Sequence, residues 1–136
     1  MTIIGFDFTR MLVERKKGMK GKMNIVSNVT IKDITEVDIA LGPDKKALKF
    51  SFLSTTKYEP EVGDISIEGD LLYMADEKEA KHVLSSWKKD KKMPEELKRP
   101  IMNYVLSKCT IQAIFLSKEM NLPAPVPMPK VEDAGK

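Results

Sequence analysis

The spacing of apolar residues along this chain changes its period once, at Ala75. Before that position, apolar and polar residues alternate in four separate segments, and after it apolar residues recur at every third or fourth position. A period of two is typical of strands with one buried face, whereas a period near 3.6 is typical of amphipathic helices. The sequence therefore predicts an α+β fold, in which a four-stranded sheet precedes the helices.

Turn signals between the four alternating segments predict one antiparallel sheet in meander order. In the first strand we expect Ile4, Phe6 and Phe8 to share a face. The second strand is expected to bend near Ile34, and the run Gly42-Pro43-Asp44 marks the turn that follows it. The predicted strands are residues 3–13, 24–39, 47–58 and 64–74.

The first predicted helix is short and amphipathic. Asp76 and Glu77 place acidic side chains at its positive end, and apolar residues then recur at helical spacing as far as Trp87. The lysine-rich run 88–92 is expected to end the helix as a solvated charge cluster.

A long second helix is predicted at the C-terminal end. Pro94 suits its first position, and Pro100 is expected to interrupt or kink its first two turns. Residues 101–120 contain no further helix breaker, which corresponds to a helix of about 30 Å at 1.5 Å per residue.

This long helix is apolar on more than one side. One stripe contains Met102, Val105, Leu106, Cys109, Ala113, Leu116 and Met120, and a second contains Leu97, Ile101, Tyr104, Ile111 and Phe115. A helix that is apolar over most of its circumference needs a partner besides its own sheet. Because one sheet and two helices offer no further layer, we expect the second stripe to contact another copy of the chain, in a dimer or tetramer.

Composition indicates one domain in a reducing compartment. The chain has 136 residues, of which 42% are apolar and 32% charged, as in soluble globular proteins. No apolar run approaches the roughly 20 residues that span a bilayer. A lone cysteine, Cys109, cannot form an internal disulfide, so we expect a cytoplasmic protein. We predict a single domain over residues 1–130 and a disordered tail over residues 131–136.

Residues that could carry catalysis or bind a metal do not form a recognisable group. Cys109 falls on an apolar stripe and is expected to be buried, and His82 lies among lysines on the short helix and is expected to be exposed. Asp64, Glu68 and Asp70 share one strand face, which favours a solvated outer face over a cation site. We therefore expect no enzymatic activity and no cofactor.

Two basic segments raise the alternative of nucleic-acid binding. The predicted loop over residues 15–22 contains five Lys or Arg residues, and four lysines follow Trp87. Lysine and arginine neutralise phosphates, and a tryptophan can stack on a base. However, Trp87 falls on the apolar face of its helix, and the net charge of the whole chain is only +3. Weak binding through the loop 15–22 stays as an alternative.

The order of elements and several short motifs resemble the SecB export chaperones, and the resemblance covers the chain almost end to end. The segments that carry it are IGFDF (residues 4–8), ALKFSFL (47–53), DISIEGDLLY (64–73) and LPAPVP (122–127). The acidic surface through which that family engages the export motor is not evident in a chain of net charge +3. The resemblance therefore implies polypeptide binding and leaves the pathway open.

What the resemblance implies is a holdase, a protein that holds unfolded or partly folded polypeptides in apolar grooves without ATP. Nine methionines agree with a surface that adapts to many shapes. The residues expected to bind polypeptide are Phe50, Phe52, Tyr73, Met102, Leu116, Met120 and Leu122. A structural adaptor that uses the same apolar faces for one fixed protein partner is the other interpretation.

Prolines occupy every second position from Pro123 to Pro129 near the C-terminus. In an extended chain this spacing removes the N–H donors from one edge and leaves those of the intervening residues on the other. We expect such a segment to lie as a strap across the protein's own apolar surface.

Overall fold

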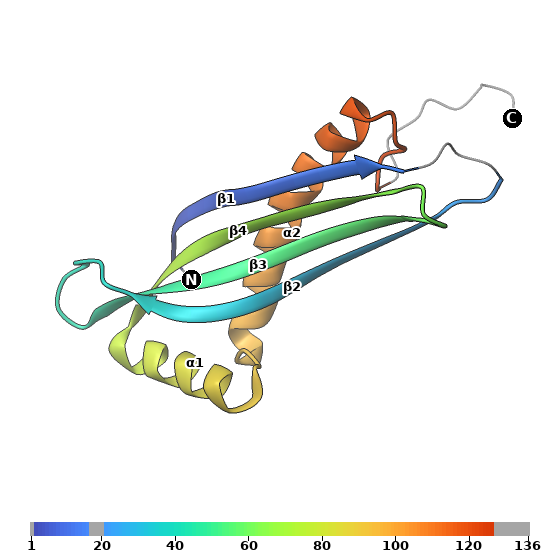
Figure 1. Cartoon of the computed structure of the whole chain (residues 1–136). Helices are drawn as coiled ribbons and strands as arrows, with labels where there is room; N and C mark the ends of the chain where they lie inside the picture. The colour runs from blue at the N-terminus through green and yellow to red at the C-terminus, as the bar shows by residue number, and fades with distance from the viewer. Residues whose placement is uncertain (1, 17–20, 127–136) are drawn as a thin grey trace, which may run out of the picture.

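A computed structural model describes residues 2–16 and 21–126 (Figure 1). It confirms the α+β class, because a four-stranded antiparallel sheet is followed by two helices. The strands are β1 (Thr2–Arg15), β2 (Asn24–Val37), β3 (Lys45–Glu59) and β4 (Gly63–Asp76), and the helices are α1 (Glu77–Asp90) and α2 (Glu95–Glu119). Each observed boundary lies within a few residues of the predicted one.

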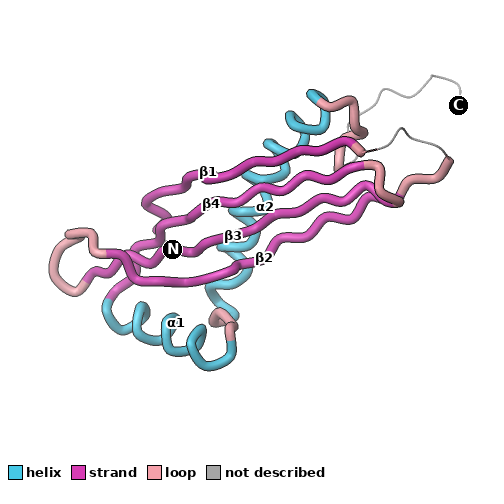
Figure 2. The backbone as a smooth tube through the Cα atoms, in the orientation of Figure 1, coloured by secondary structure: helices cyan, strands magenta, loops and turns pink. Residues whose placement is uncertain are grey.

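The strand order is β1-β4-β3-β2, so the predicted meander is wrong for the first strand. β1 and β2 form opposite edges of the sheet, as Figure 2 shows. The backbone N–H of Lys16 donates to the carbonyl oxygen of Val62, 2.8 Å away, where the chain leaves β1. Residues 16–23 are long enough to cross a sheet whose strands lie about 4.8 Å apart, and the result is a Greek key.

The face of the sheet toward the helices carries the core. Side chains of β3 and β4 alternate between buried and partly exposed along the whole strand, as the period of two predicts. Phe50, Phe52 and Leu71 are fully buried on the inner face. Residues of both helices join them in one apolar cluster, so the helices cover a single face.

Bulges change which residues of the edge strands point inward. The pairing of β1 with β4 steps from Ile3 to Gly5, which leaves Ile4 as an extra residue. Ile3 therefore joins Phe6 and Phe8 against the core, and Ile4 is 39% exposed. The expectation that Ile4 shares the face of Phe6 and Phe8 is wrong. The alternation of apolar and polar residues in the sequence does not show where a bulge inserts an extra residue.

A similar irregularity occurs in β2, near the bend predicted at Ile34. Its pairing with β3 steps from Ile31 to Asp33. As a result, Ile31 and Ile34 are both buried although they lie three positions apart.

Helix α1 has a side-chain cap at its start. The Asp76 carboxylate accepts a hydrogen bond of 2.7 Å from the backbone N–H of Glu79. At the other end Lys91 adopts a left-handed conformation, with φ of 56°, and its N–H donates to the carbonyl of Trp87. The helix is a few residues longer than predicted, and its buried residues are Ala80, Val83 and Trp87.

Helix α2 is a single helix that contains Pro100, so the predicted interruption does not occur. The carbonyl oxygen of Pro94 accepts from the N–H groups of Leu97 and Lys98, each at 3.0 Å, which starts the helix. Pro100 lacks the N–H that would pair with the carbonyl of Glu96. Because Glu96 is exposed near the helix end, water can satisfy that carbonyl.

The buried side of α2 is one row with a spacing of four residues. Its members are Leu97, Ile101, Val105, Cys109, Ala113 and Ser117. The first five come from the two predicted stripes, and Ser117 belongs to neither. The helix runs behind the strands and crosses them (Figure 1). As a helix crosses the strands, the side of the helix that faces the sheet changes from one turn to the next. A row of residues spaced by four follows this change, whereas a straight apolar stripe along the helix does not.

Candidate functional site

Two neighbouring hollows are lined by both the edge strand β2 and helix α2. One of about 340 Å³ lies beside the connection between α1 and α2, and one of about 100 Å³ lies beside residues 122–126. Val29 lines both, so they form one continuous surface. We name it the β2–α2 groove and define it by Val29, Ile31, Trp87, Met93, Met102, Leu106 and Thr110.

One flank of α2 forms a wall of this groove. Met102 lines the larger hollow, and Leu106 and Thr110 line the smaller one, at intervals of four residues. Leu106 is 47% exposed, although the helix buries its neighbour Val105 completely. The groove therefore presents apolar side chains that the chain's own core leaves accessible.

Trp87 forms the base of the larger hollow. It is 7% exposed, and its indole N–H donates to the carboxylate of Asp33 at 3.2 Å. The Nζ of Lys91 lies 5.4 Å from the centre of the ring. Contacts from β2 and from the end of α1 thus fix the indole in one orientation.

Strand β2 contributes an open edge to the groove. Its ladder pairs with β3 alone among the described strands, so every second residue directs its backbone N–H and carbonyl groups away from the sheet. An extended polypeptide can add to such an edge through main-chain hydrogen bonds. Val26, on the same strand, is also exposed.

Residues 122–126 close one end of the groove. Leu122 is buried, and its N–H donates to the carbonyl of Ser117 at 2.8 Å. The hydroxyl of Tyr58 donates to the carbonyl of Pro123 at 2.6 Å. These contacts agree with the strap predicted from the prolines, while residues 127–136, including the predicted disordered tail, lie outside the described part of the chain.

The outward side of α2 forms a second apolar surface. Ile111 is 53% exposed and Phe115 is 61% exposed, with no chain segment over either in the described structure. Tyr104 packs edge-on against Phe6 of β1, and the Nζ of Lys108 lies 5.6 Å from the Tyr104 ring. We name Tyr104, Ile111 and Phe115 the α2 outer row.

Three of the residues predicted to bind polypeptide lie in the core. Phe50, Phe52 and Tyr73 are covered by the helices, so a ligand could reach them only if a helix moved. The Tyr73 hydroxyl donates to the carboxylate of Glu79 at 3.1 Å, and burial raises its pKa to about 12. In the described conformation these three side chains hold the sheet and helices together.

The other four predicted binding residues are spread along α2 and beyond it. Met102 lines the β2–α2 groove. Leu116 and Met120 are half-buried against the core, and Leu122 lies beneath the strap. Of the seven predicted residues, therefore, Met102 alone contributes to the groove as we define it.

The residues predicted to form an oligomer interface divide into two groups. Leu97 and Ile101 are buried against the chain's own sheet. The other three form the α2 outer row and leave apolar surface accessible to a second copy.

Several groove residues were not among the predicted binding residues, namely Val29, Ile31, Trp87, Met93 and Leu106. Val29 and Ile31 matter because β2 is an edge strand, which follows from the Greek key order and not from alternation. Trp87 could have been predicted from the sequence as a groove residue, since an aromatic residue on the apolar face of a helix, beside a run of lysines, indicates the margin of a buried surface.

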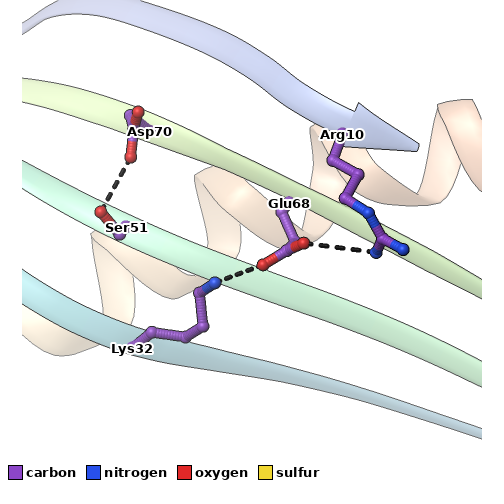
Figure 3. Close-up of polar contacts among 5 residues, drawn as sticks. All are labelled: Arg10, Lys32, Ser51, Glu68 and Asp70. Atoms are coloured by element: carbon purple, nitrogen blue, oxygen red, sulfur yellow. Dashed lines mark hydrogen bonds and ion pairs between the residues drawn. The ribbon is translucent and has the colours of Figure 1, made fainter. Parts of the chain in front are cut away.

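On the opposite face of the sheet, polar side chains of neighbouring strands contact one another (Figure 3). Glu68 lies between Arg10 and Lys32, and its pKa is held below the usual value mainly by the hydrogen bond from Lys32. The Ser51 hydroxyl donates to Asp70 at 2.8 Å. These contacts agree with a solvated face, and within residues 2–16 and 21–126 no three His, Cys, Asp or Glu side chains are placed to hold a metal ion.

The remaining candidates for chemistry, Cys109 and His82, lie in different environments. Cys109 is fully buried, as predicted, and burial raises the pKa of its thiol to about 11. His82 is exposed on α1, also as predicted. Neither described helix is long and apolar enough to cross a bilayer.

The basic loop predicted over residues 15–22 is described in part. Arg15 donates to the carbonyl of Met120 at 3.4 Å, and the Nζ of Lys16 lies 3.2 Å from the Asp64 carboxylate. Residues 17–20 lie outside the described part of the chain. Both described cations at the start of the loop thus have partners within the protein.

Comparison with known proteins agrees with this geometry at the level of the fold. No family model and no curated protein matches the sequence. Among solved structures, a Mycobacterium tuberculosis SecB-like chaperone in complex with a ChAD peptide from an antitoxin matches with a TM-score of 0.55. The match covers 96% of this chain and 90% of that chain. The fold is SecB-like.

Sequence identity over that match is 10%. An identity this low shows a distant structural relationship, and the SecB-like fold of this chain does not by itself carry the other protein's ligand. Function has to be argued from the groove and from the outer row of α2.

Proposed function

We propose that this protein binds unfolded or partly folded polypeptides without ATP, as a SecB-like holdase. The observation that carries the proposal is the β2–α2 groove, an accessible apolar surface beside the open edge of a strand. The peptide in the structure of the SecB-like chaperone supports it at the level of the fold. The proposal includes no enzymatic activity and places the protein in the cytoplasm, where Cys109 stays reduced.

The groove suits a ligand of varied sequence. Main-chain hydrogen bonds to the edge of β2 do not depend on the ligand's side chains. Met93 and Met102 supply unbranched, flexible side chains that can repack against different apolar groups. A polypeptide in extended conformation would thus gain backbone pairing on one side and apolar contact on the other.

The proposal includes a homo-oligomer, a dimer or a tetramer, formed through the α2 outer row. Ile111 and Phe115, one helical turn apart on α2, expose apolar surface that a second copy of the chain could cover. The outer row and the groove occupy different sides of α2, so a second copy on the outer row would leave the groove accessible.

The direct test is suppression of aggregation of a chemically unfolded client protein. Wild-type protein is expected to suppress aggregation at a stoichiometry near one, and Met102→Asp together with Leu106→Asp is expected to abolish the effect, because buried charges oppose apolar contact. Asn103→Asp, at an exposed polar position between them, is the matched control. Aggregation that proceeds unchanged with wild-type protein would refute the proposal.

A structural adaptor is the second candidate. The SecB-like chaperone that matches this fold is bound to a peptide from one defined protein, which agrees with a dedicated partner as well as with a general client. Affinity capture from cell extract separates the two. One stoichiometric partner supports the adaptor, whereas many substoichiometric polypeptides support the holdase.

A further inference from the structure

The larger hollow of the β2–α2 groove has a cationic rim. Lys91, Lys92 and Lys98 line it, together with a single carboxylate from Glu95. Lys91 and Lys92 belong to the connection between the helices, and Lys98 lies in the first turn of α2. The rim therefore carries an excess of positive charge on a chain whose total is close to neutral.

None of these lysines takes part in an ion pair within the described residues. Elsewhere several cations of the sheet lie against carboxylates: Arg10 and Lys32 contact Glu68, Lys16 contacts Asp64 and Lys46 contacts Glu36. Lys91 contacts the face of Trp87, which leaves its charge uncompensated by a carboxylate. A site with unneutralised cations on its rim attracts ligands that carry negative charge.

The floor inside this rim is apolar. Ile31, Trp87 and Met93 are each buried beneath the opening, and Met102 forms its wall. The hollow of about 340 Å³ has room for one large apolar side chain. A free anion would gain nothing from this apolar floor. The ligand that suits both the rim and the floor carries negative charge together with an apolar group.

We propose that the larger hollow selects extended polypeptide segments in which an apolar side chain is flanked by acidic residues. This inference rests on the proposed function and specifies which polypeptides the groove prefers. We call the apolar side chain that enters the hollow the anchor. In a strand added to β2, residues two positions before and after the anchor lie about 7 Å from it, and acidic residues there would place their carboxylates over the rim. Among unfolded polypeptides, the preferred partner is thus an acidic segment with an apolar anchor.

Trp87 makes this proposal measurable, because it is the one tryptophan of the sequence. Two synthetic peptides without aromatic residues are titrated against the full chain and followed by Trp87 fluorescence. Both have the same Val-Leu-Val centre, with Glu and Asp flanks in one and Lys flanks in the other. The acidic peptide is expected to bind about tenfold tighter, by an amount that falls as salt rises.

Charge reversal on the rim provides the matched variant. Lys92→Glu with Lys98→Glu is expected to remove or invert the preference between the two peptides. Lys78→Glu, an exposed lysine of α1 away from the groove, is the control and is expected to keep it. Suppression of client aggregation is measured on the same proteins.

Equal affinity for the two peptides, with aggregation still suppressed, would overturn this inference and leave the proposed function standing. Failure of both peptide binding and suppression would refute both. A single-stranded oligonucleotide that quenched Trp87 at lower concentration than the acidic peptide would also overturn it, in favour of a nucleic-acid ligand. A preference that follows the rim charges supports the inference.

Discussion

Gly69 lies at the closest approach between β4 and its neighbours. A Cβ atom at this position would clash with the backbone oxygen of Asp7 and would lie 2.6 Å from the Cζ of Phe52. We expect Gly69→Ala to lower the free energy of unfolding by about 1–3 kcal/mol, since the core must shift to admit a methyl group. Denaturant unfolding measures the change.

Gly5→Ala is the matched control for that substitution. A Cβ at Gly5 would lie 3.2 Å from the Cδ1 of Leu72, the end of a flexible side chain that can move aside. Its effect on the free energy of unfolding is expected to be clearly smaller. Equal losses at both positions would contradict the close contact described at Gly69.

Cys109 is expected to resist thiol reagents in the folded protein. Burial raises the pKa of its thiol to about 11, so the reactive thiolate is scarce at pH 8, and the sulfur is fully covered. Because the folded state keeps the proton, this group's contribution to stability is present below the ordinary thiol pKa and is lost as the pH rises from there towards 11. Labelling with a chromogenic thiol reagent, with and without denaturant, tests the first point, and native labelling at the denatured rate would contradict it.

Individual residue environments were predictable where one apolar period determined them. Cys109 is buried and His82 is exposed, as expected. Ile4 was misplaced because one inserted residue reverses the alternation, and the bulge depends on the pairing with β4.

The elements themselves followed from the sequence more completely than their arrangement did. Alternation identified four strands and the face each buries, yet it holds no information about which strand is the neighbour of β1. The Greek key order places β1 beside β4 and makes β2 an edge. For that reason the groove beside β2 could not be predicted, although one of its wall residues, Met102, was.

Helix α2 shows the same limit. Its apolar residues were recognised, but the assignment of Leu97 and Ile101 to an outer stripe assumed a helix that keeps one side toward the sheet. Successive residues of the observed buried row are four positions apart, from Leu97 to Ser117, and the row includes residues of both predicted stripes. The crossing direction of a helix over a sheet is a tertiary property.

The attachment of residues 122–126 to the sheet is expected to depend on one hydrogen bond. Tyr58→Phe removes the donor to the Pro123 carbonyl and should lower the free energy of unfolding by about 1 kcal/mol. Backbone amide exchange at Ala124 and Val126 should become faster, because the segment loses its attachment to β3. Tyr104→Phe is the control, and unchanged exchange at both amides would contradict the strap.

The proposed function assigns separate roles to two apolar surfaces on different sides of α2. The outer row would join copies of the chain, and the β2–α2 groove would bind polypeptide. The contacts of Glu68 with Arg10 and Lys32 lie on the face of the sheet away from both surfaces. Each role can thus be removed by substitution without the other.

Oligomeric mass tests one half of this division. The wild-type protein is expected to have the mass of a dimer or tetramer by light scattering, and Phe115→Asp is expected to reduce it, since a charge would be buried between copies. Leu106→Asp, on the groove side, should leave the mass unchanged. A wild-type monomer would contradict the proposed role of the outer row.

Hydrogen–deuterium exchange with and without an unfolded client tests the groove most directly. The account predicts that a bound client slows exchange of the backbone amides along β2, residues 24–37, because their outward N–H groups become paired. Amides of β1 at the opposite edge should keep their rates. Protection confined to β1, or no protection on β2 at client concentrations that prevent aggregation, would contradict the assignment of polypeptide binding to the β2–α2 groove.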